Sequence, residues 1–147
     1  MDIDKFENSG IIPEKIKDII KTAHDEHGKV AYRVIKHEQS LGLLESDFYP
    51  TFIQRNHGIA PDSEAQKKLK VEDFGMSVLE TFSQLKDFLE AVPSLRKPPK
   101  FNACGYINSC KGCVSYPENN GHFQYFLYDP INNNPRCDFN ICEEDEQ

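Results

Sequence analysis

Residues 101–107, FNACGYI, and residues 122–128, HFQYFLY, decide the fold of this chain. In both stretches, every second position carries an apolar or aromatic side chain. This alternation is typical of a β-strand, because successive side chains of a strand point to opposite faces of the sheet. A short strand at 114–116 and the turn 117–121, PENNG, precede the second stretch, so we expect a hairpin there.

Three further segments have the composition of strands. Residues 29–37 and 74–79 alternate β-branched, aromatic and polar side chains, and residues 137–142 follow a polar loop. We therefore expect strands in both halves of the chain, with most of them after residue 100.

Two segments have the spacing of amphipathic helices. The first, 13–27, begins at Pro13, repeats apolar residues every three or four positions and stops at Gly28. The second begins at Thr81, which forms a capping box with Gln84, and continues to Pro93. The sequence predicts a helix at each place.

Together these elements predict an α+β fold in one domain that spans residues 1–147. A chain of 147 residues is long enough to bury a core of its own. We expect the N-terminal amphipathic helix and the central helix to pack on a mostly antiparallel, C-terminally strand-rich sheet. Residues 1–10 and 143–147 are expected to fray at the ends.

The net charge of −7 limits the classes of partner. It opposes phosphate backbones, so we expect no nucleic-acid partner, and it suits a partner protein with a basic surface. No stretch approaches the roughly 20 apolar residues of a membrane span, and the first residues lack the features of a signal peptide. We therefore expect a cytoplasmic protein with no membrane partner.

Five cysteines raise the question of zinc. Cys110 and Cys113 have the two-residue gap with which a tight turn directs both sulfurs at one zinc ion, and Cys137 and Cys142 can complete four ligands. Zinc is thus one interpretation of these four residues. The alternative is a turn whose thiols never meet a metal ion.

Arg33 and His122 are the other candidate site residues. Arg33 lies in an otherwise apolar strand, so its charge requires an acidic partner, an exposed sheet face, or a bound phosphate or carboxylate. His122 begins the strand that is dense in aromatic residues, where a pocket can form.

The order of these elements resembles that of ADP-ribosyltransferases. Tyr32 and Arg33 lie on a first strand, and Ser77 lies on a later strand that is followed by a helix and another strand. The resemblance implies that Arg33 and Ser77 hold NAD, and His122 is a third catalytic candidate. The glutamate that this family uses has no clear counterpart in the sequence.

The chain also resembles short uncharacterised bacterial proteins of the kind found on mobile elements. The similarity lies in Tyr32-Arg33, in DFYPT at 47–51, in GMS at 75–77 and in the strand 122–128. It implies a role in conflict between an element and its host. Because the chain is acidic and lacks a catalytic set, our preferred hypothesis is a non-enzymatic, protein-binding regulator or inhibitor, and the alternative is an NAD-dependent ADP-ribosyltransferase-like enzyme.

Overall fold

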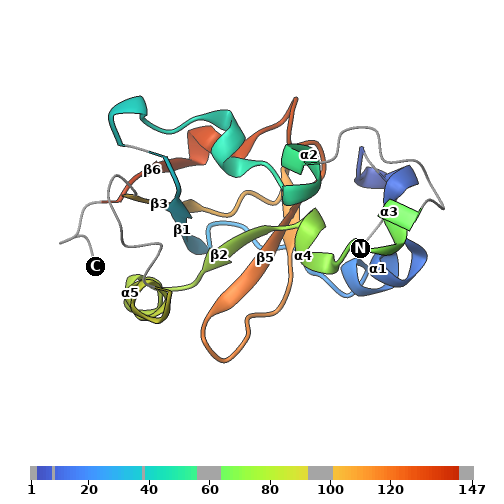
Figure 1. The fold of residues 1–147 in the computed structure, drawn as a ribbon, viewed down its shortest axis with the longest axis horizontal. Helices are drawn as coiled ribbons and strands as arrows, with labels where there is room; N and C mark the ends of the chain where they lie inside the picture. Colours follow the sequence, from blue (N-terminus) through green and yellow to red (C-terminus); the bar gives the residue numbers. More distant parts are fainter. Residues whose placement is uncertain (1–2, 8, 38, 56–63, 93–100, 143–147) are drawn as a thin grey trace.

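The fold is α+β, with helices packed on a six-stranded antiparallel sheet (Figure 1). The computed structural model describes residues 3–7, 9–37, 39–55, 64–92 and 101–142. The strands lie in the order β4-β5-β2-β1-β3-β6. Their bounds are β1 Val30–Ile35, β2 Met76–Leu79, β3 Phe101–Tyr106, β4 Gly112–Val114, β5 His122–Leu127 and β6 Phe139–Ile141. The predicted antiparallel, C-terminally strand-rich sheet is confirmed, although its two central strands, β2 and β1, come from the part of the chain before residue 80.

Short helices are found in the remaining described chain. The α-helices are α1 Glu14–Ile20, α2 Thr51–Arg55, α3 Glu64–Lys67, α4 Val71–Phe74 and α5 Phe82–Ala91. Single 3₁₀ turns are found at Ile3–Lys5, Ser9–Ile11, Gln39–Leu41, Glu45–Phe48 and Pro135–Asp138. Among the residues that the structure describes, no helix has the length and apolar character needed to cross a membrane.

One face of the sheet carries the main hydrophobic core. Alternate residues of the strands are almost completely buried there, among them Ala31, Val78, Ala103 and Tyr125. Phe48, the last residue of the 3₁₀ turn Glu45–Phe48, is buried with them. The cluster includes Val114 from β4 and Phe139 from β6, the two edge strands of the sheet. Since side chains from opposite edges share one core, the sheet curls around it.

The described residues on the other face form two separate clusters. Helix α5 packs against Leu79, Tyr32 and Val34 of the central strands. Helices α1, α2 and α4 pack against Phe126 of β5 and Tyr128, which follows it. Figure 1 shows α5 at the left of the molecule, and α1, α3 and α4 at the right.

Helix α1 is shorter than the sequence predicts. It ends at Ile20 rather than at residue 27, because the following chain pairs with the edge of the sheet. The backbone N–H and C=O of His24 both hydrogen bond to Val114, with N···O distances of 2.9 Å. Pairing with strand β4 therefore replaces the last two turns of the predicted helix.

The last strand is also shorter than predicted. Asn134 caps a 3₁₀ turn at Pro135–Asp138, with its side-chain oxygen 2.9 Å from the N–H of Arg136. Proline at the first position of this turn favours the helical conformation. Cys137 therefore lies in the turn, and strand β6 begins at Phe139.

Within the predicted frayed end 1–10, the described residues around Phe6 pack against the sheet, while residues 1–2 and 8 lie outside the described residues. The ring of Phe6 is 5.0 Å from that of Tyr128 in an edge-to-face arrangement, and the residue is only 6% exposed. The N–H of Glu7 donates a 2.8 Å hydrogen bond to the carbonyl of Tyr128. Burial of this aromatic pair holds the segment against the sheet. Residues 143–147, the other predicted frayed end, lie outside the described residues.

The predicted capping box at the start of α5 is confirmed and can be tested. The hydroxyl of Thr81 accepts from the N–H of Gln84, and the side-chain oxygen of Gln84 accepts from the N–H of Thr81, both at 3.1 Å. We expect Thr81→Ala to lower the free energy of unfolding by about 1 kcal/mol, because a helix N–H loses its partner. Urea denaturation followed by circular dichroism measures this change.

Ser83→Ala is the matched control, since it also removes a hydroxyl group. Ser83 is exposed inside the first turn of α5, and its replacement should leave the urea midpoint unchanged or slightly higher. Equal destabilisation by the two substitutions would contradict the capping role of Thr81.

Candidate functional site

A pocket lies where the two central strands diverge. Strand β1 pairs with β3 along its whole length. It pairs with β2, in contrast, at the single position Tyr32↔Leu79. Beyond this pair the gap between β1 and β2 opens into a pocket of about 250 Å³. Its walls come from both strands, from the start of α2 and the segment before it, from α5 and from the first residue of β5. The lining residues are Tyr32, Arg33, Val34, Lys36, Tyr49, Thr51, Gly75, Ser77, Val78, Leu79, Phe88 and His122.

The three predicted site residues line this same pocket. Arg33 comes from β1, Ser77 from β2 and His122 from the start of β5. These strands are neighbours in the sheet, and the register pairs His122 with Leu79. The order of the strands therefore brings together residues that are far apart in the sequence.

Arg33 bridges the gap between the strands. Its Nη1 donates to the carbonyl oxygen of Ser77 at 2.7 Å, and its Nε donates to the carbonyl oxygen of Asp47 at 2.8 Å. The carboxylate of Asp47 does not contact Arg33 directly. It accepts a hydrogen bond from the N–H of Leu44 and forms another with Nε2 of His37, each at 2.8 Å. Arg33 is therefore held by backbone carbonyls, and it takes part in none of the ion pairs formed among the described residues.

This environment alters the protonation of Arg33. Burial lowers the pKa of its guanidinium to about 10, and the charge of Asp47 opposes this effect only in part. The group remains protonated at neutral pH, since its pKa is still well above 7. The pocket thus contains a poorly solvated positive charge that has no direct acidic partner among the described residues.

Ser77 and its neighbours form a polar part of the wall. The hydroxyl oxygen of Ser77 accepts from Nε2 of Gln124 at 3.1 Å, which leaves the hydroxyl hydrogen to donate to a ligand. Oε1 of Gln124 is buried and makes no hydrogen bond to any described residue. A side chain at Gly75 would collide with this same oxygen, so the close approach of strand β2 to Gln124 requires glycine.

The chemistry of the lining favours a small anion. Arg33 and the exposed Lys36 supply positive charge, while Ser77 and Thr51 supply hydroxyl groups. Among the described residues that line the pocket, none is Asp or Glu. The arrangement can bind an oxyanion, but its lining provides no carboxylate for general acid–base chemistry.

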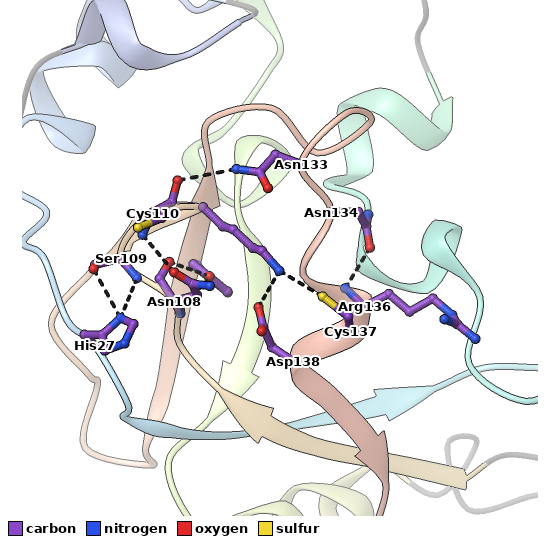
Figure 2. Close-up of polar contacts among 11 residues, drawn as sticks. His27, Asn108, Ser109, Cys110, Asn133, Asn134, Arg136, Cys137 and Asp138 are labelled. Carbon is purple, nitrogen blue, oxygen red and sulfur yellow. Dashed lines mark hydrogen bonds and ion pairs between the residues drawn. The ribbon is translucent and has the colours of Figure 1, made fainter.

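The predicted zinc site is not formed. Cys113 is fully buried in the cluster with Phe126, and burial raises the pKa of its thiol to about 12, which disfavours the thiolate that zinc requires. Cys142 packs beside the cluster of α5, and Figure 2 shows Cys110 and Cys137 apart from each other. In the described part of the chain, no three His, Cys, Asp or Glu side chains form a group that could hold a metal ion.

Sequence reasoning missed several residues of functional interest. Lys36 lies just after β1, so the alternation of the predicted strand 29–37 could have indicated it, whereas Thr51 reaches the pocket only through the path of the loop before α2. Lys111, which lies between Cys110 and Cys113 in the sequence, is 9% exposed and contacts Cys137 and Asp138. No local pattern predicts the burial of this lysine.

The chain matches no protein-family model, and neither the curated proteins nor the solved structures contain a significant match to it. The resemblances to ADP-ribosyltransferases and to mobile-element proteins therefore stay predictions.

The different environments of the cysteines predict their reactivity. Cys110 and Cys137 are exposed, whereas Cys113 is buried and its raised pKa keeps the thiol protonated at neutral pH. With iodoacetamide at pH 7.5, we expect Cys110 and Cys137 to be alkylated much faster than Cys113. Peptide mass spectrometry at successive times measures the three rates.

The unfolded chain in urea is the control, because there the three thiols should react at similar rates. Rapid native alkylation of Cys113 would contradict its position in the core.

Proposed function

We propose that the chain is a non-enzymatic binding protein that takes a small oxyanion, a carboxylate or phosphate group, in the pocket between β1 and β2. The observation that supports this most is Arg33, a poorly solvated guanidinium that borders the pocket and forms no direct ion pair with a residue that the structure describes. Guanidinium groups bind carboxylate and phosphate strongly, because charge and hydrogen bonds act together. A bound oxyanion would supply a counter-charge in direct contact with Arg33, which no described side chain provides.

The size of the pocket supports a small ligand group. Sites for drug-sized molecules usually enclose about 300–1,000 Å³. The pocket here has about 250 Å³ and opens to solvent beside Lys36, which is exposed. It therefore suits one charged group, either free or at the end of a larger molecule, better than a whole dinucleotide.

The predicted regulatory role is a separate proposal. The net charge of −7 supports a partner with a basic surface, since opposite charges steer association. The positive pocket is a local exception within this acidic chain, so an anionic ligand and a basic partner would use different parts of the surface. The identity of such a partner stays a prediction.

Titration with inorganic phosphate and with acetate, followed by amide NMR, tests the oxyanion site. We expect the largest shifts at Arg33, Ser77 and His122. Lys36→Gln should weaken binding about two- to fivefold, because it removes one exposed charge from the lining. Ser77→Ala should also weaken binding, and it keeps the backbone carbonyl that holds Arg33.

Lys15→Gln is the matched control for Lys36→Gln, because it removes the same charge from an exposed position on α1. Its affinity should equal that of the unmodified protein. Shifts that follow surface lysines in general, or equal effects of the two substitutions, would overturn the proposed site.

The enzymatic alternative has one observation in its favour: Arg33, Ser77 and His122 share the pocket. The pocket volume, and the lack of Asp or Glu among the described lining residues, support the binding protein instead. On our proposal, protein incubated with NAD releases no nicotinamide above the buffer control. Release that falls at least tenfold in both Ser77→Ala and His122→Ala, with unchanged circular dichroism, would favour the enzyme and contradict the proposal.

A further inference from the structure

A second cluster of reactive side chains lies away from the pocket. Nζ of Lys111 is 3.1 Å from Sγ of Cys137 and 2.8 Å from Oδ2 of Asp138 (Figure 2). None of these three residues lines the oxyanion pocket. An amine and a thiol in direct contact are two nucleophiles that can be joined once one of them is oxidised.

Hydrogen bonds from the side chain of Tyr125 hold the turn that carries Lys111. The hydroxyl of Tyr125 donates to the carbonyl of Asn108 at 3.0 Å and accepts from the N–H of the same residue at 3.1 Å. The side chain of Asn108 accepts from the N–H of Cys110 at 2.9 Å. These bonds hold the turn in one conformation, so Lys111 extends toward the Pro135–Asp138 turn and is 9% exposed.

The segment that carries Cys137 is held as firmly. Nε of Arg136 donates to the carbonyl of Leu43 at 2.6 Å, and the amide of Asn134 donates to the carbonyl of Pro130 at 2.8 Å. On strand β3, a side chain at Gly105 would collide with the carbonyl of Asp138. Two well-ordered segments therefore fix the contact between nitrogen and sulfur.

The sulfur is accessible and the nitrogen is not. Cys137 is exposed and borders two open grooves of about 770 and 390 Å³. The side chain of Lys111 is 11% exposed. A small oxidant from solvent therefore reaches the thiol of Cys137 before the amine of Lys111, which lies 3.1 Å from the sulfur.

We propose that Cys137 and Lys111 form a redox-sensitive covalent cross-link, in which hydrogen peroxide oxidises the thiol and the amine condenses with the product to give a sulfenamide. This site of modification is independent of the oxyanion pocket.

The chemistry balances in two steps. The sulfur of Cys137 attacks peroxide, so that an S–O bond forms, the O–O bond breaks and one water leaves, which gives a sulfenic acid. The neutral amine of Lys111 then attacks the sulfur, so that an N–S bond forms, the S–O bond breaks, and the departing hydroxide takes a proton from nitrogen and leaves as a second water. One thiol, one amine and one peroxide thus give one sulfenamide and two waters.

Asp138 controls the second step. Burial lowers the pKa of Lys111, but the hydrogen bonds and charges of Asp138 and Cys137 raise it more, so the net pKa lies above its ordinary value. Lysine attacks only as the neutral amine. The carboxylate that holds the ammonium in place therefore slows condensation, and Asp138→Asn accelerates it.

The cross-link has a structural consequence. Lys111 immediately precedes β4, and the turn that carries Cys137 immediately precedes β6, the two edge strands. A bond between them closes a loop from residue 111 to residue 137 and fastens the two edges of the curled sheet together. Such a closure stabilises the fold mainly by restricting the unfolded chain.

Peptide mass spectrometry of the full-length protein after treatment with hydrogen peroxide and blocking of free thiols tests the proposal. We expect the Lys111 and Cys137 peptides to be linked with a loss of two hydrogen atoms, trypsin to fail at Lys111, and dithiothreitol to reverse both changes. The urea midpoint should rise on oxidation and return on reduction.

Lys111→Arg keeps the positive charge and removes the nucleophilic amine. In this variant Cys137 should stop at the sulfenic acid and react with dimedone several times more than in the unmodified protein. Cys110→Ser is the control and should form the cross-link normally, while Asp138→Asn should form it faster.

Three results would overturn the proposal: equal dimedone labelling of Cys137 with and without Lys111, oxidation to sulfinic acid with no linked peptide, or a linked peptide that carries an additional oxygen atom. Because neither phosphate nor acetate takes part, failure of this experiment leaves the oxyanion site untouched.

Discussion

Tyr125 is the side chain on which the β4 edge of the sheet and the turn before it depend. It is fully buried in the main core, and its backbone pairs with Met76 on β2 and Val114 on β4. Its hydroxyl holds the turn at Asn108, while burial raises the pKa of the phenol and keeps it a neutral donor. The edge strand β4, the turn that carries Lys111 and the central strands are therefore positioned by one residue. Packing density makes such a residue hard to replace, since a core accommodates few changes of volume or polarity.

The pocket has a different physical origin, because it depends on backbone pairing that is incomplete. Where β1 and β2 diverge, Arg33 donates to the carbonyl of Ser77 in place of a backbone N–H. A side chain that takes over this function must remain polar and partly desolvated. The charged hydrogen-bond donors with which Arg33 joins the strands also allow it to bind anions strongly. Structure and ligand binding are coupled at this residue.

The sequence predicts this molecule well where a pattern is local. Period-two alternation indicated strands β3 and β5, and the capping box located α5, because the forces involved act between near neighbours. Long-range pairing decided the rest. Helix α1 ends early because His24 pairs with Val114, and the cysteines do not converge because Cys113 faces one cluster and Cys137 faces Lys111. Arg33 and His122 were identified from their positions in predicted strands, and Ser77 from the resemblance to ADP-ribosyltransferases. Their common pocket follows from a strand order that no local pattern contains.

The edge strands β4 and β6 are each three residues long, and the outer side of β4 is partly occupied by His24. Unpaired backbone groups at the edge of a sheet invite strand addition by another molecule, which is the usual start of fibril growth. Within the described chain, short edges leave few such groups available. The described part of this aromatic-rich sheet therefore offers only a short template for β-pairing with another molecule.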